Sequence, residues 1–305
     1  MRGSPGTKNV GLILTVAAAF VVVALTVVVF WVSKITSTRP NFEELLSNTM
    51  RKIQLVSALR INLHASVEAE KSAVLADTDE ASQSFADQAD HASSAVEQAR
   101  KELEQLIEAE KIPKEMDLLG EFNGCWERFR EIDRTLLPLA VQNTNLKAFN
   151  LSFGPASEAI RRMELALTKL IDISSASPQA SQIVKEAFEA LTAAVKIHAS
   201  QAPHIAEVSD VRMDEIEAAM GGYDQEVNDS LSALGKLVDL TGKPALDAAG
   251  ADYGDFKKIN AEVIRLSREN SNVRSLALSL GQKRKVTAQC EEILSALQDT
   301  VQSTR

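Results

Sequence analysis

The chain has 305 residues, a formal net charge of −9 at pH 7 and two cysteines. The acidic balance argues against binding to nucleic acid and against adhesion to anionic lipid, and so few cysteines do not make a disulfide framework. Aromatic residues, glycine and proline are scarce beside alanine, leucine, glutamate and lysine, so we expect an all-α fold.

The first predicted element is the apolar stretch 10–32, which contains no charged residue and no proline. A helix of this length spans about 35 Å, enough to cross a hydrocarbon core of about 30 Å. The stretch is longer than the apolar core of a cleavable signal peptide, and Trp31 lies where an interfacial aromatic anchor is typical. We therefore expect a transmembrane helix that anchors the chain in the lipid bilayer, preceded by a short tail, residues 1–9.

The charges on either side of this stretch bear on its orientation. Arg2 and Lys8 precede it, whereas Lys34 and Arg39 follow it, so the positive-inside rule gives a slight preference for a cytoplasmic N-terminus. With that orientation the rest of the chain is exported. We therefore expect a single-pass protein of the cytoplasmic (inner) membrane whose helical region is periplasmic or extracellular.

Three helical regions are predicted after the anchor. A juxtamembrane segment is expected to end at Pro40-Asn41, and capping-box patterns predict helices that begin there and near Asp77. The second helix is closed before Pro113. A third helical region follows, up to about residue 173, and Pro138 and Gly154-Pro155 are expected to kink or break it.

The C-terminal part of the sequence predicts two more helices, then a loop and a last helix. Either Pro203 or Gly221-Gly222 marks the turn between the two helices, and we favour the glycine pair because glycine adopts positive φ at no steric cost. Residues 241–255 are predicted to form the one clear loop of the sequence. The last helix is predicted from about 256 to 301, and its run Lys283-Arg284-Lys285 is expected to face water.

The sequence contains a duplication, which appears when the chain is shifted by 127 positions against itself. The paired positions are Phe129, Ile132, Leu139, Asn143, Asn145, Leu151, Ser152 and Gly154, which recur as Phe256, Ile259, Leu266, Asn270, Asn272, Leu278, Ser279 and Gly281. A unit that recurs once predicts two packing modules rather than an open solenoid. We therefore expect two antiparallel bundles of four-helix type, residues 41–173 and 177–303, stacked end to end or lying side by side.

Three phrases of the sequence resemble a known family of domains. They are QNTNLKAFNLSFGPA from Gln142, ENSNVRSLALSLGQKR from Glu269 and SVEAEKSAVLADTDE from Ser66. They resemble the four-helix-bundle sensor domain of methyl-accepting chemotaxis receptors. The resemblance implies an extracytoplasmic bundle that binds small ligands or partner proteins and usually functions as a dimer. Those receptors continue into a second membrane helix and a cytoplasmic signalling half, for which this sequence shows no segment, so we expect it to sense only with a partner.

The candidate ligand-binding residues are Arg60, Asn143, Asn270 and Arg274. Asn143 and Asn270 fall on the apolar seam of their helices, where an asparagine either fixes the register of the bundle or belongs to a polar layer that binds a ligand. Arg60 lies on the seam of the first helix, where it either forms a salt bridge or extends its head to solvent. Helix lengths place all four at a similar height, and such a layer would suit a small organic anion.

Other chemistry finds little support in the sequence. The four histidines show no metal-ligand spacing, and no phosphate-binding loop or nucleophile motif is present, so we expect no enzyme activity, no metal and no cofactor. Cys125 and Cys290 are expected at a similar height, and two separate buried thiols are favoured over a disulfide.

Two functions remain open from the sequence. The first is a membrane-anchored sensor module for signal transduction or chemotaxis that works as a homodimer or with a receptor. The alternative is a structural or scaffolding stalk that dimerises or spaces its partners at the membrane.

Overall fold

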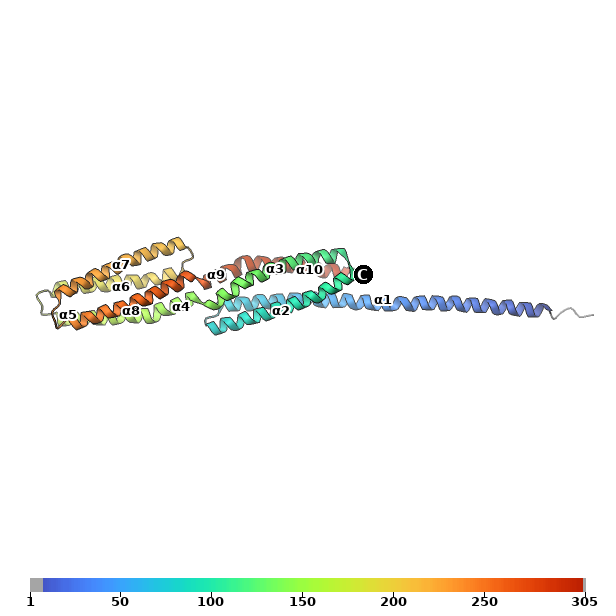
Figure 1. Ribbon diagram of the computed structural model, residues 1–305, viewed down its shortest axis with the longest axis horizontal. Coiled ribbons are helices and arrows are strands. Elements are labelled where there is room, and N and C mark those ends of the chain that lie inside the picture. The colour runs from blue at the N-terminus through green and yellow to red at the C-terminus, as the bar shows by residue number, and fades with distance from the viewer. Residues whose placement is uncertain (1–7, 304–305) are drawn as a thin grey trace, which may run out of the picture. The chain divides into compact units, whose positions relative to one another are not determined.

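The computed structural model describes the backbone of residues 8–303 and the side chains of residues 26–29 and 43–303. Over these residues the fold is all-α, as predicted, with two short π-helical turns and no strand (Figure 1). The elements are α1 (Lys8–Leu75), α2 (Asp79–Glu110), α3 (Pro113–Gln142), α4 (Thr144–Leu151), η1 (Ser152–Ala156), α5 (Ser157–Ile173), α6 (Ala180–Ala206), α7 (Asp210–Leu237), α8 (Lys243–Glu269), α9 (Ser271–Leu278), η2 (Ser279–Lys283) and α10 (Arg284–Ser303).

The stretch predicted to cross the membrane, residues 10–32, belongs to α1, but most of its side chains lie outside the described residues. Among the residues that the structure describes, no helix is both long enough and apolar enough to span a membrane. The backbone of α1 is helical from Lys8 to Leu75 without interruption. The predicted end of a juxtamembrane segment at Pro40-Asn41 is therefore wrong, because the helix continues through both residues.

The chain forms two compact units, and the first contains residues up to Ile61, Val96–Glu121 and residues from Glu292. Its buried apolar side chains come from α1, α2, α3 and α10, and they include Leu55, Leu59, Leu103, Ile107, Leu119, Leu294 and Leu297. Lys52 is also buried in this unit, where its ammonium group lies 2.7 Å from Glu110 and 2.8 Å from Glu115. Two carboxylates thus compensate the charge of one buried lysine.

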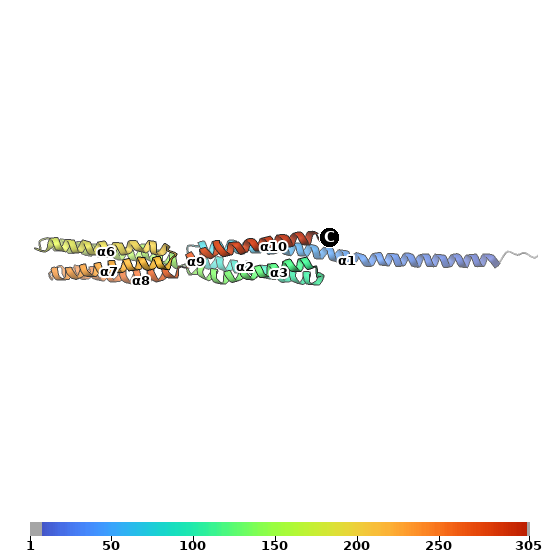
Figure 2. The same cartoon turned by 90° about the horizontal axis from the view of Figure 1, so that it is seen from above.

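The second unit contains Asn62–Ala95 and Phe122–Glu291. Within it, α5, α6, α7 and α8 form a four-helix bundle, and both views show these helices side by side (Figures 1 and 2). Buried residues from all four helices make its core, including Met163, Leu167, Ile183, Ala190, Ile197, Val227, Leu234, Ala249 and Phe256. This bundle takes α5 from the first predicted repeat and the other three helices from the second.

The turn between α6 and α7 lies at residues 207–209, so its predicted position at Gly221-Gly222 is wrong. Both glycines lie inside α7, and no described glycine has a positive φ. The turn is instead stabilised by side chains: the carboxylate of Glu207 accepts the backbone N–H groups of Val208 and Ser209, and the hydroxyl of Ser209 caps α7. Capping by short polar side chains outweighs the flexibility of glycine here.

The predicted loop 241–255 is also mostly wrong, because α8 begins at Lys243. Asp239 accepts hydrogen bonds from the backbone of Thr241 and Gly242, which closes a short turn before the helix. Pro244 then lies in the first turn of α8, where its missing N–H costs nothing. The long last helix that we expected does not form, since Asn270 interrupts it.

Candidate functional site

Two asparagines interrupt the helices at equivalent places in the duplicated sequence. Asn143 ends α3 with φ 49°, and Asn270 ends α8 with φ 53°, so both adopt the left-handed conformation that asparagine tolerates better than most residues. Each is followed by a helix of eight residues and then by a π-helical turn. Pro138 does not break α3, and the interruption comes at Asn143 instead.

The helices that follow these turns contact each other through reciprocal hydrogen bonds. The backbone N–H of Thr144 donates to the hydroxyl of Ser271 at 3.0 Å, and the N–H of Ser271 donates to the hydroxyl of Thr144 at the same distance. Asn145 and Asn272 repeat this exchange with their side-chain oxygens at 3.1 and 3.2 Å. Each pair is separated by 127 residues, the offset of the duplication, so α4 and α9 meet with local two-fold symmetry.

We call these residues the asparagine layer: Asn143, Thr144, Asn145, Asn270, Ser271 and Asn272. Five of the six are buried, with Asn272 partly exposed. The side-chain amide of Asn272 donates to Asn143 at 2.9 Å, and that of Asn145 donates to Asn270 at 2.7 Å. The amide nitrogens of the two turn residues are occupied as well, because Asn143 donates to Asp79 and Asn270 donates to the carbonyl of Glu207.

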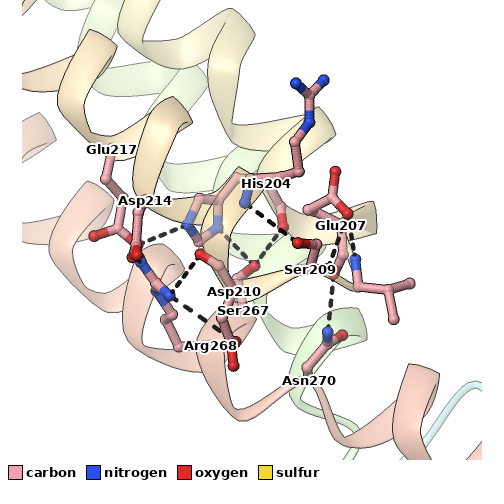
Figure 3. A network of polar contacts seen from close by, with 11 residues as sticks. His204, Glu207, Ser209, Asp210, Asp214, Glu217, Ser267, Arg268 and Asn270 are labelled. Carbon is pink, nitrogen blue, oxygen red and sulfur yellow. Dashed lines mark hydrogen bonds and ion pairs between the residues drawn. The ribbon is translucent and has the colours of Figure 1, made fainter.

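A second polar network begins beside Asn270 and connects α6, α7 and α8 (Figure 3). His204 is completely buried, with Nδ1 2.8 Å from the hydroxyl of Ser267 and Nε2 2.8 Å from the carboxylate of Glu217. Arg268 donates to the same Glu217 oxygen at 2.6 Å and also pairs with Asp214. Partial burial alone would raise the pKa of Glu217, but the hydrogen bonds from Arg268 and His204 hold it below its usual value.

A groove of about 680 Å³ lies between α4 and α8 and reaches Thr144 of the asparagine layer. Its polar lining residues are Gln142, Thr144, Lys147, Asn150, Glu262, Arg265 and Glu269. The cations are already paired, because Lys147 lies 2.7 Å from Asp79 and Arg265 pairs with both Glu262 and Glu269. The groove is therefore close to electrically neutral and can contact a small molecule through amide and hydroxyl groups.

The four sequence-predicted site residues lie in different surroundings. Asn143 and Asn270 both belong to the asparagine layer, although their side chains do not bond to each other directly. Arg274 lies on the following helix, exposed to solvent and without an ion-pair partner among the described residues. Arg60 belongs to the other compact unit, where its guanidinium donates to Gln298 at 3.2 Å.

The sequence reasoning missed a buried charge cluster formed by Glu70, Asp133 and Lys283. Lys283 was expected to face water, but it is only 1% exposed, because it forms an ion pair with Asp133 and lies over the ring of Phe129. Glu70 is completely buried, and neither of its carboxylate oxygens has a hydrogen-bond partner. Burial raises the pKa of Glu70 and of Asp133, and it lowers the pKa of Lys283 to about 8.

Cys125 of α3 and Cys290 of α10 form a disulfide, with their Cα atoms 5.7 Å apart. The expectation of two separate thiols is therefore wrong. The similar height that helix lengths indicated was correct, but height gives no information on the rotation of each helix about its axis, which decides whether two thiols meet. The described residues contain no cluster of three or more His, Cys, Asp and Glu side chains able to hold a metal ion.

Comparison with known proteins gives one result for this chain. A family model described as a four helix bundle sensory module for signal transduction matches residues 6–190. This is more than half of the sequence, and it includes one of the two asparagine turns. No curated protein matches the chain.

Proposed function

Because the chain belongs to the family of four-helix-bundle sensory modules for signal transduction, we propose that it is a membrane-anchored, extracytoplasmic sensor. It binds a small ligand and acts through a receptor or as a homodimer. The family assignment confirms the predicted resemblance, and a sensory bundle is a binding module rather than a catalyst. The ligand, the partner and the membrane anchor belong to the proposal.

The anchor and the location are supported by two observations. The sequence contains the apolar stretch 10–32. The helix α1 continues from that stretch without a break into residues that pack in the first compact unit. The disulfide between Cys125 and Cys290 supports an oxidising compartment, because such bonds persist outside the cytoplasm and are rare within it. The first observation supports a membrane anchor, and the second favours a helical region on the outer side of the membrane.

The observation that carries the sensory proposal is the reciprocal contact of α4 and α9 in the asparagine layer. Two passes of the chain are interrupted at equivalent residues, Asn143 and Asn270, and are held together there by side-chain hydrogen bonds rather than by continuous helix. A signal needs an element that can adopt two arrangements, and we assign that role to this layer, where two helices are interrupted together.

Within this proposal the predicted site residues have separate roles. Asn143 and Asn270 hold the layer, and Arg274 offers a guanidinium that can bind the carboxylate of a small organic anion. We propose that Arg60, in the first compact unit, also contributes to ligand binding. The variant Arg60→Ala tests this separately. We also keep the predicted repeats, 41–173 and 177–303, as the proposed products of the duplication.

Thermal unfolding of the purified chain against organic acids, amino acids and amines tests the sensory role. A ligand present at about a hundred times its Kd stabilises the folded state by about 2.7 kcal/mol. We expect an organic acid to raise Tm, with the rise lost in Arg274→Ala and kept in Arg284→Ala, which removes an exposed cation from the helix α10. A separate loss in Arg60→Ala would place a contribution in the first unit. The sensory proposal fails if no compound raises Tm.

One observation favours the alternative of a structural stalk. The amide nitrogen and the amide oxygen of Asn143 and of Asn270 each have a partner in the protein, as expected of residues that only fix the register of a bundle. The thermal experiment separates the two functions, because a spacer does not respond to small molecules.

A further inference from the structure

The bundle of α5–α8 has a second groove, between α6 and α7, that the proposed sensory role does not use. Its volume is about 750 Å³. The residues that matter for its chemistry are Glu189, Glu226, Asp229, Ser230, Lys196 and Phe188. All belong to the second compact unit, and none belongs to the asparagine layer or to the groove between α4 and α8.

The groove has more carboxylates than cations around it. Three of its four carboxylates have a lysine partner: Lys185 lies 3.3 Å from Glu186 and 2.9 Å from Glu189, and Lys196 lies 3.7 Å from Glu226. Asp229 accepts a hydrogen bond from the amide of Gln225 and has no cationic partner among the described residues. The charge of Asp229 is therefore left uncompensated, and a bound cation beside it would stabilise the groove.

A buried hydroxyl in the groove provides independent support. Ser230 is 7% exposed and lines the groove, yet its hydroxyl has no hydrogen bond to another described residue. Serines inside helices often bond to the carbonyl four residues earlier, as Ser200 does to Lys196 at 2.9 Å. The hydroxyl is therefore free to accept a hydrogen bond from a ligand N–H group that enters the groove.

The apolar part of the groove comes from Phe188, whose side chain is 68% exposed. An aromatic face next to carboxylates attracts ammonium groups through its quadrupole and also covers methylene groups. We propose that this groove binds an aliphatic polyamine, with one ammonium group between Glu226 and Asp229, an N–H group on Ser230, and the alkyl chain against Phe188. The proposal does not rest on the sensory role of the chain.

Calorimetric titration of the full chain with spermidine tests this site, at about 150 mM salt to screen diffuse attraction. We expect saturable binding with a Kd below about 1 mM. Glu226→Gln combined with Asp229→Asn should weaken binding about tenfold, because it removes charge-assisted hydrogen bonds. Glu164→Gln combined with Glu215→Gln removes the same charge from exposed positions of the same bundle outside the groove, and it should leave the Kd within about twofold.

Two further variants each change a single side chain, so the test does not depend on the double variant folding correctly. Phe188→Ala changes an exposed ring and should weaken spermidine binding about threefold, and Ser230→Ala should do so by a similar factor. The proposal is overturned if no saturable binding occurs or if the charge-matched control weakens binding as much as the groove variant. It is also overturned if Phe188→Ala dissociates a dimer while spermidine fails to bind, because the groove would then be an interface between two copies.

Discussion

Asn145 and Asn272 exchange the same hydrogen bond in both directions: the backbone N–H of each donates to the side-chain oxygen of the other, at 3.1 and 3.2 Å. The two residues occupy equivalent places in the duplicated sequence. The duplication therefore does more than repeat a helix, because its two copies bind each other through the residues that they share. Four predictions follow from this contact and from the buried groups around it.

Asn145→Ala should lower the free energy of unfolding by about 1–3 kcal/mol, because buried partners lose their hydrogen bonds. The groups left without a partner include the N–H of Asn272 and the carbonyl of Ile205. Urea unfolding followed by circular dichroism measures the change. Asn150→Ala, at an exposed position of the same helix, should change it by less than about 0.5 kcal/mol. Equal effects of the two variants would contradict an energetic role for the exchange.

Glycine should be better tolerated than alanine at Asn143, in the reverse of the usual order for helices. Both substitutions remove the side-chain amide, so the difference between them reports the cost of the positive φ less the extra entropy that glycine has in the unfolded chain. We expect Asn143→Gly to be more stable than Asn143→Ala by about 1 kcal/mol. At Lys147, an exposed position within α4, alanine should be more stable than glycine by about 1 kcal/mol. A more stable Asn143→Ala variant would show that the left-handed turn is not retained in solution.

Glu70→Gln should weaken the pH dependence of stability. Burial raises the pKa of Glu70, and the charge of Lys283 opposes this only in part, so the folded state keeps its proton after the unfolded carboxyl has ionised. Stability is therefore fully present below about pH 4.5 and is lost as pH rises toward the folded pKa, by up to about 1.4 kcal/mol per pH unit. Unfolding midpoints between about pH 4.5 and 8 measure this slope.

The matched control for this prediction is Glu68→Gln, which removes an exposed carboxyl from the same helix. The other charged groups that face Glu70 are Asp133, Lys283 and Lys71, and they remain unchanged in both variants. We expect the slope to fall in Glu70→Gln and to persist in Glu68→Gln. A slope that is identical in the wild type and in Glu70→Gln would show that Glu70 is ionised in the folded protein.

Removing the disulfide with Cys125→Ser and Cys290→Ser should destabilise the chain substantially. The bond closes a loop with a sequence separation of 165, for which the chain-entropy model gives about 5 kcal/mol, a value that engineered cases often fail to reach. Thermal unfolding with and without dithiothreitol measures the effect. The reductant should lower the Tm of the wild type and leave that of the double variant unchanged. If the reductant leaves the wild-type Tm unchanged, the result would argue that the disulfide does not form.

The all-α class and the importance of the two asparagine phrases could be predicted, because composition and internal repetition are properties of the sequence itself. The turn between α6 and α7 was misplaced because the prediction considered only the conformational freedom of Gly221-Gly222. A helix keeps glycines when the rest of its apolar face is buried, and Met220 and Val227 flank this pair in the core of the bundle.

The buried Lys283 could not be found from the sequence, because it lies in a basic run that is typical of a solvated face. Its burial depends on Asp133 and Phe129, more than a hundred residues earlier in the chain. The disulfide could not be predicted either. Helix lengths gave the height of each cysteine but not the side of the helix on which its thiol lies. Helix lengths also placed Arg60 at the height of Asn143 and Asn270, and in the structure it donates a hydrogen bond to Gln298 of the first compact unit.

The two π-helical turns, Ser152–Ala156 and Ser279–Lys283, follow the two asparagine turns at the same spacing. A π-helical turn accommodates extra backbone within a helix and thereby rotates every residue after it about the helix axis. Inserting or deleting one residue in only one copy would turn α5 relative to its neighbours by about 100°, or α10 relative to its own. A change of length in either segment therefore disrupts the packing of the helix that follows it, which predicts that natural variation in length collects in the turns between α5 and α6 and between α7 and α8.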